Sequence, residues 1–152
     1  MTSDMWLEGK VFKPGKSKYW AVEIPALYAH TQGRTKKDAY RMAVDLVDTM
    51  AVDMGLKFRV KIKIGKDDKF YITGAPYIKF MPFILRRQRQ SQGLSIADVT
   101  KRMGVKSRNT YARYEQGKTE PTLSRFNQIM AVLNNDAVPT FNIGILEKDI
   151  AV

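Results

Sequence analysis

The sequence contains no cysteine and a single histidine, His30. Without thiols the chain cannot form disulfides, use a cysteine nucleophile or bind zinc through cysteines. A histidine-based metal site or catalytic dyad would need ligands from another chain. No apolar run approaches the roughly 20 residues that a membrane span requires. The N-terminal stretch lacks a basic region followed by an apolar core, so we expect no secretory signal and a cytoplasmic protein.

Acidic residues are also scarce relative to basic ones. The chain has 26 Lys and Arg against 15 Asp and Glu, which gives a net charge of +11. Residues 1–82 hold 15 basic and 9 acidic residues and residues 83–152 hold 11 and 6, so the excesses of +6 and +5 sum to +11. Such a charge favours nucleic acid or an anionic membrane surface as a partner. Because both halves are basic, DNA binding by one half would explain only part of the charge.

Residues 94–121 carry the pattern of two short helices joined by a tight turn. Ser95 followed by Asp98 is typical of a capping box at a helix N-terminus. Three apolar residues then follow at helical spacing: Ile96, Val99 and Met103. Gly104 ends this helix, because the turn needs a residue that adopts the left-handed conformation. The pattern predicts a helix-turn-helix.

The second helix of this pair is predicted to start at Ser107 as its cap and to end at Gly117, with Pro121 preventing its continuation. Tyr111 and Tyr114 are expected to face inward. The outward residues are short or planar hydrogen-bonding types that can read base edges in a major groove. The candidate DNA-binding residues are Ser107, Arg108, Asn109, Thr110, Ala112, Arg113, Gln116 and Lys118. The alternative is an ordinary helical hairpin whose polar face is merely solvated.

Flanking helices are expected to complete this bundle. Pro82 suits the first position of a helix that continues through FILRRQRQSQG, with three arginines near its exposed side that could touch phosphate: Arg86, Arg87 and Arg89. Thr122 can cap a last helix whose predicted core residues are Leu123, Phe126, Met130 and Leu133. An alternating stretch from Pro139 could pair with its symmetry mate in a homodimer, or fold back on its own chain.

The sequence pattern of the N-terminal half predicts a sheet with one helix. Strands are expected at 5–13, 19–24, 57–64 and 70–73, the first two forming a hairpin. Thr35 can cap a helix that runs to Gly55, with an unbroken apolar stripe from Ala39 to Met54 that we interpret as core. The strand at 57–64 alternates perfectly and turns four basic side chains outward: Lys57, Arg59, Lys61 and Lys63. Their role is either a solvated face or contact with phosphates or an acidic partner.

Two family resemblances accompany these patterns. The segment RYEQGKTEPT, after LSIADVTKRMGV, resembles the Xre (Cro/CI-type) helix-turn-helix family, although Ile96 stands where that family usually has a glutamine for a phosphate contact. The segment EIPALYAHTQGRTKKDAYRMAVDLV resembles the HicB antitoxin family. That resemblance implies a partial, degenerate RNase H-like unit that neutralises a HicA-like mRNA-cleaving toxin, while the Xre-type module binds operator DNA and represses the operon.

We therefore expect an α+β protein in which a β-β-(β)-α-β(-β) unit precedes an all-α bundle. The predicted parts are a HicB-like domain at 1–74, a linker at 75–81, a DNA-binding domain at 82–135 and a tail at 136–152. An alternative is an orphan or phage-type repressor whose N-terminal domain senses an effector or oligomerises. A nuclease is the weakest hypothesis, because its metal site would have to come from scattered carboxylates: Glu8, Glu23, Asp38, Asp45 and Asp48. We expect no enzymatic activity, no cofactor and no metal.

Overall fold

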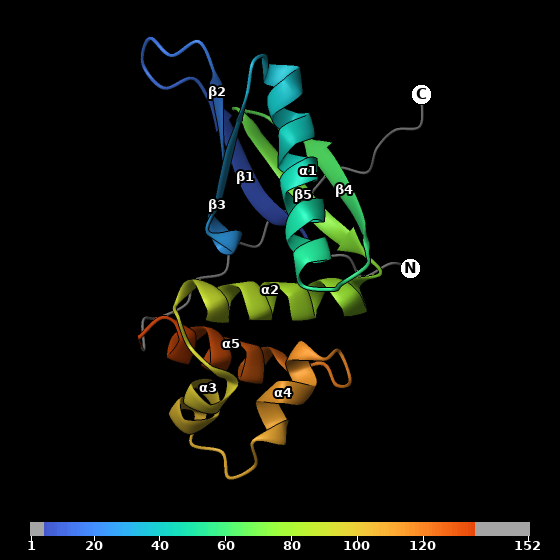
Figure 1. Cartoon of the computed structure of the whole chain (residues 1–152), viewed down its shortest axis with the longest axis vertical. Coiled ribbons are helices and arrows are strands. Elements are labelled where there is room, and N and C mark those ends of the chain that lie inside the picture. The colour runs from blue at the N-terminus through green and yellow to red at the C-terminus, as the bar shows by residue number, and fades with distance from the viewer. Residues whose placement is uncertain (1–4, 136–152) are drawn as a thin grey trace.

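A computed structural model describes residues 5–135 (Figure 1). The first half contains five strands, one α-helix and a short 3-10 helix, and only helices follow. The elements are β1 (Leu7–Phe12), β2 (Trp20–Ile24), the short 3-10 helix η1 (Pro25–Leu27), β3 (Ala29–Gly33), α1 (Lys36–Asp53), β4 (Arg59–Ile64), β5 (Lys69–Ala75), α2 (Tyr77–Ser91), α3 (Ile96–Met103), α4 (Asn109–Glu115) and α5 (Leu123–Leu133). None of the helices in this part of the chain combines the length and the apolar character needed to span a bilayer.

The five strands form one antiparallel sheet in the order β3-β2-β1-β5-β4. Helix α1 lies across one face of it (Figure 1). The predicted cap forms, because the Thr35 hydroxyl accepts a hydrogen bond from the Asp38 N–H at 3.0 Å. Small side chains of α1 are fully or almost fully buried against the sheet: Ala39, Ala43, Val47 and Ala51. The predicted hairpin, helix and later strands are confirmed, and β3 stands in the position of the optional third strand in the predicted β-β-(β)-α-β(-β) order.

Strand β4 was predicted to alternate between side chains that face the core and side chains that face outward. On β4, Val60 and Ile62 pack towards the core and Arg59 is exposed, as predicted, but Lys61 and Lys63 are half-buried, so the predicted alternation is confirmed only in part. Ile64 departs from the prediction, since its side chain is 60% exposed. It is the last residue of β4, which is an edge strand of the sheet.

Helix α2 joins the two halves and belongs to both cores. Phe80, Phe83 and Ile84 pack with the sheet and α1, while Met81 and Leu85 belong to the core of the C-terminal helices. The predicted linker at 75–81 is therefore wrong. It consists of the end of β5 followed by the start of α2, whose apolar residues are buried in both cores. The helix lies between the sheet unit and the other C-terminal helices (Figure 1).

Pro82 lies inside α2, not at its first position as predicted. A proline within a helix forgoes a backbone hydrogen bond at a cost of about 3 kcal/mol. The helix nevertheless extends back to Tyr77, because this brings Phe80 and Met81 into the two cores, where they are 0% and 6% exposed. Burial of these large side chains, about 1.5–3 kcal/mol each, offsets the loss.

Helices α2, α3, α4 and α5 form the C-terminal bundle around a core that includes Leu85, Val99, Tyr111 and Ile129. Thr122 caps α5 as predicted, its hydroxyl accepting from the Arg125 N–H at 3.1 Å. The assignment of Leu123 to this core was wrong: the residue is 75% exposed at the first position of α5, before the helix reaches its neighbours. The predicted strand after Pro139 lies outside the described residues.

Candidate nucleic-acid interface

Helices α3 and α4 are held across their turn by the local signals of the sequence. The Ser95 hydroxyl accepts from the Asp98 N–H at 3.0 Å, and the Asp98 carboxylate accepts from the Ser95 N–H at 2.8 Å. This capping box lowers the pKa of Asp98, chiefly through the Ser95 hydroxyl. Gly104 follows α3 in the left-handed conformation with φ +68°. The chain thereby turns within a few residues and starts α4 at Asn109.

The start of α4 differs slightly from the prediction. The N-cap position is Arg108, in a helical conformation, and not Ser107. The Ser107 hydroxyl still accepts a hydrogen bond from the Asn109 N–H, at 3.3 Å. Both residues precede the first turn of α4 and are exposed, so their side chains lie at its N-terminal end. Thr110, in the first turn, is half-buried.

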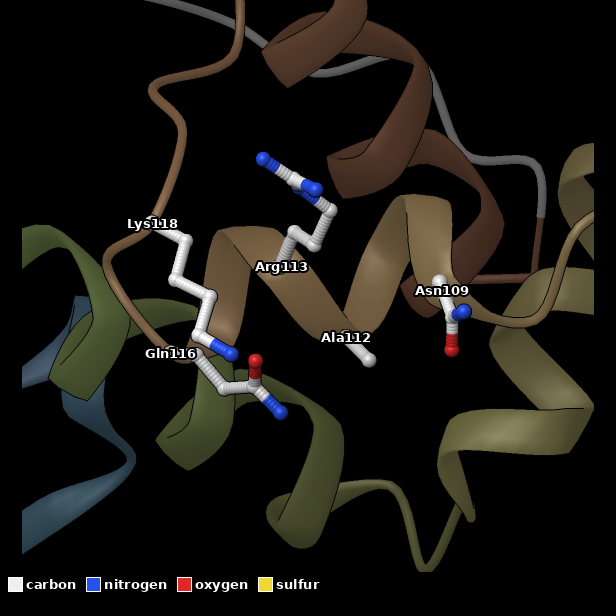
Figure 2. Close-up of a pocket in the computed structure, with 5 residues that line it drawn as sticks. All are labelled: Asn109, Ala112, Arg113, Gln116 and Lys118. Atoms are coloured by element: carbon white, nitrogen blue, oxygen red, sulfur yellow. The ribbon is translucent and has the colours of Figure 1, made fainter.

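A polar hollow lies along the exposed side of α4. Five of the eight candidate residues line it: Asn109, Ala112, Arg113, Gln116 and Lys118. Figure 2 shows their side chains along α4 and the loop after it, with the short Ala112 side chain between the longer polar ones. The remaining three candidates, Ser107, Arg108 and Thr110, are not among the residues that line this hollow.

The chemistry of this surface suits a base edge and a phosphate backbone. An arginine donates a planar pair of N–H groups, and an asparagine or glutamine amide both donates and accepts. The small Ala112 side chain allows a close approach between these groups. Lys118 supplies a mobile positive charge of the kind that contacts phosphate. Arg113, Gln116 and Lys118 are all exposed, so their donor groups are accessible to a ligand.

The loop after α4 is fixed by its backbone. Gly117 takes the left-handed conformation, with φ +68°, and ends the helix as predicted. The Gln116 N–H donates to the Ala112 carbonyl at 3.0 Å, and the Lys118 N–H donates to the Arg113 carbonyl at 3.0 Å. These bonds place the loop lysine beside the helix and not away from it, which explains why Lys118 shares the hollow with residues of α4 (Figure 2).

Comparison with known proteins assigns this region to a family. Residues 85–138 match the helix-turn-helix family model. The chain carries a helix-turn-helix domain of the Xre type. A protein of Archaeoglobus fulgidus, named as a candidate HTH-type transcriptional regulatory protein, is 34% identical to the chain over 85 residues. The similarity covers 53% of this chain but only 27% of that relative, so the chain matches about a quarter of the relative's length. No solved structure gives a significant match.

A buried ion pair orients α4 within the helix-turn-helix domain. The Arg89 guanidinium of α2 donates to both carboxylate oxygens of Glu115, at 2.5 and 3.0 Å, and to the Leu94 carbonyl at 2.8 Å. The two side chains are 13% and 6% exposed. The Tyr111 hydroxyl also donates to Glu115, at 2.7 Å. Burial, followed by the proximity of Glu115, raises the pKa of Tyr111. The Arg89 guanidinium thus connects α2 with α4 and with the turn before α3.

The three arginines of α2 that were predicted near its exposed side have structural partners instead. Arg86 donates to the Met54 carbonyl at 3.0 Å, and Arg87 donates to the carbonyls of Leu27 and Tyr28 at 2.6 and 3.0 Å. Arg89 forms the buried pair described above. The sequence did not reveal these partners because they lie 26 to 60 residues away in the chain, and contact of Arg86 or Arg87 with phosphate stays a prediction.

The carboxylates considered for a metal site are dispersed. Glu8 lies 3.4 Å from the Lys69 ammonium, and Arg41 pairs with both Asp38 and Asp45. Among residues 5–135, no three His, Asp or Glu side chains lie close enough together to hold a metal ion.

Proposed function

We propose that the chain is a transcriptional regulator that binds duplex DNA by placing α4 in the major groove. The proposal rests on one observation above all: side chains of α4 and its following loop share one exposed polar hollow. Two of them, Asn109 and Arg113, can hydrogen-bond base edges, while Lys118 can contact the phosphate backbone of the DNA. No reaction is required of such a protein, because DNA occupied by it is closed to other proteins. Two copies of the chain would read paired half-sites, as helix-turn-helix dimers do.

The test is a selection of duplexes by the full chain from a random-sequence library. A regulator of this type enriches one sequence motif. If the protein binds as a dimer, the motif should consist of two half-sites about one helical turn apart. Arg113→Ala should lose preference at one position of the motif, whereas Arg41→Ala on the surface of α1 should retain the whole motif. Failure of the wild-type chain to enrich any sequence over the starting library would refute sequence-specific binding.

We further propose that the sheet unit is the antitoxin part of a type II toxin-antitoxin pair and binds a HicA-like toxin. Support comes from the element order β-β-β-α-β-β before the helix-turn-helix domain, which agrees with the order that the HicB resemblance implies. The net charge of +6 on residues 1–82 counts against a basic toxin, which would need a cluster of acidic residues at the interface of this unit. Co-expression with the neighbouring reading frame and a pull-down on this chain test the pairing. Absence of a co-purifying protein favours the alternative, an orphan or phage-type repressor whose sheet unit binds an effector or another copy.

We also propose that the chain has no nuclease activity. The support is the engagement of Glu8, Asp38 and Asp45 in ion pairs with basic side chains, whereas two-metal hydrolysis needs carboxylates that converge on metal ions about 4 Å apart. Incubation of the purified chain with labelled RNA and DNA in Mg²⁺ or Mn²⁺ is the corresponding measurement. Cleavage that disappears in Glu8→Gln would contradict this proposal.

A further inference from the structure

Three segments of the sheet unit meet at the end that points away from the helix-turn-helix domain. They are the β1–β2 loop at 13–19, the β3–α1 connection with the first two residues of α1 at 34–37, and the β4–β5 turn at 65–68. Pairing of Trp20 with Gly33 brings the first two together, and the Val11 N–H donates to the Asp68 carbonyl at 2.8 Å beside the third. In Figure 1 the β1–β2 loop and the start of α1 lie at the top of the molecule, and α3 and α4 lie at the bottom.

These three segments carry a concentration of positive charge, here called the distal basic cluster. Its members are Lys13, Lys16, Lys18, Arg34, Lys36, Lys37 and Lys66. The same segments contain two acidic residues, Asp67 and Asp68, so seven positive and two negative charges leave +5. Lys36 pairs with Asp68. Within residues 5–135, Lys16, Lys18 and Lys37 have no ion-pair partner.

The preference of a helix start does not explain two of these cations. Lys36 and Lys37 are the first two residues of α1. The backbone N–H groups at this end of a helix carry partial positive charge, which favours acidic residues and disfavours lysine. The third residue, Asp38, meets this preference, and its pKa is lowered by the Arg34 backbone N–H and then by Arg41. The two lysines therefore add repulsion to a helix start that a single acid already stabilises.

A tryptophan holds two of the lysines in position. The ammonium groups of Lys13 and Lys36 lie 5.9 and 5.6 Å from the centre of the Trp20 ring. These are cation–π contacts, which attract an ammonium group to a ring face. The bond to Asp68 constrains Lys36 further. Part of the cluster is thus preorganised around one ring, a different arrangement from isolated surface lysines that move independently.

We propose that the distal basic cluster binds the phosphate backbone of a second DNA duplex while the helix-turn-helix domain holds the first. Duplex DNA carries one negative charge per roughly 1.7 Å of axis, so a group of seven cations on three adjacent segments can contact several phosphates. Lysine ammonium groups are point charges that contact phosphate without reading bases, so this contact is independent of sequence. Because α2 belongs to both cores, the two surfaces sit on one body. The protein would bridge two DNA segments, an inference that rests on DNA binding by the helix-turn-helix domain.

The experiment captures a second duplex on a preformed complex. The duplex selected by the wild-type chain is immobilised and saturated with protein, and a labelled duplex of unrelated sequence is then added over a series of salt concentrations. The test variant is the triple substitution Lys16→Gln, Lys18→Gln, Lys37→Gln. A matched variant removes three charges elsewhere on the exposed surface: Lys10→Gln, Arg41→Gln, Lys79→Gln.

We expect the wild-type and matched variants to retain the labelled duplex and the test variant to lose it. In solution, the slope of log affinity against log salt for the second duplex should fall by about 2.7 in the test variant, roughly 0.9 for each phosphate contact removed. The test variant should bind its selected duplex within about twofold of wild type, which separates this result from failure of the helix-turn-helix domain. The proposal would be overturned if the test variant retained the labelled duplex, or if the matched variant lost it equally. It would also be overturned if single-stranded RNA displaced the labelled duplex far more strongly than unlabelled duplex does at equal phosphate concentration.

Discussion

Removal of the Glu115 side chain should destabilise the protein far more than removal of a surface charge. Glu115→Ala leaves the Arg89 guanidinium in a site where it is 13% exposed, and also removes the acceptor of the Tyr111 hydroxyl. Loss of one partner of a buried pair costs about 3–5 kcal/mol. We expect about 3 kcal/mol, the lower end, because Arg89 keeps its bond to the Leu94 carbonyl. For a chain of this size that corresponds to a fall in Tm of about 6–12 °C.

Urea denaturation followed by circular dichroism measures this free energy in the full chain. Arg41→Ala is the matched control, because Arg41 also pairs with carboxylates but is 65% exposed, so its loss should cost less than about 1 kcal/mol. Glu115→Gln should fall between the two, since its amide oxygen can still accept from Tyr111. A loss below about 1 kcal/mol for Glu115→Ala would show that the pair does not hold α4 on α2.

Two further predictions concern pH and packing. The raised pKa of Tyr111 means that its neutral phenol contributes stability below the unfolded pKa of about 10 and that this contribution is lost at higher pH. In a spectrophotometric titration, Tyr111→Phe should reduce the fraction of tyrosine that ionises only at the highest pH. An unchanged fraction would contradict the assignment. Gly33→Ala should cost about 3 kcal/mol, because a Cβ there would lie 2.3 Å from the backbone nitrogen of Ala39. The neighbouring exposed Gln32→Ala should cost under about 0.5 kcal/mol, and equal losses in urea denaturation would show that the strand yields to the added methyl group.

Local signals predicted the starts of α1 and α3 and the turn that follows α3. The Ser95–Asp98 capping box, the cap at Thr35 and the left-handed Gly104 each depend on residues within a few positions of one another, so their chemistry is visible in the sequence. The hollow beside α4 was predictable in the same way. Asn109 and Arg113 lie four residues apart on one helix, and local backbone bonds bring the following loop to them.

Features that depend on long-range packing were not predictable in this way. Pro82 suggests a helix start, and only the two separate cores that α2 enters explain why the helix begins five residues earlier, at Tyr77. Likewise Arg87 and Arg89 have the sequence appearance of solvated or phosphate-binding residues. Their partners, the carbonyls of η1 and the Glu115 carboxylate, come from segments that the fold brings close.

The proposed function requires that the exposed face of α4 bind DNA bases. Its most direct test is the fluorescence anisotropy of the selected duplex titrated with wild-type protein, Arg113→Ala and Arg41→Ala at one salt concentration. We predict a loss of about 1–3 kcal/mol for Arg113→Ala, which is a weakening of about 5- to 150-fold. Arg41→Ala should bind as wild type does. Equal affinities for all three proteins, with their folding verified by circular dichroism, would contradict the claim.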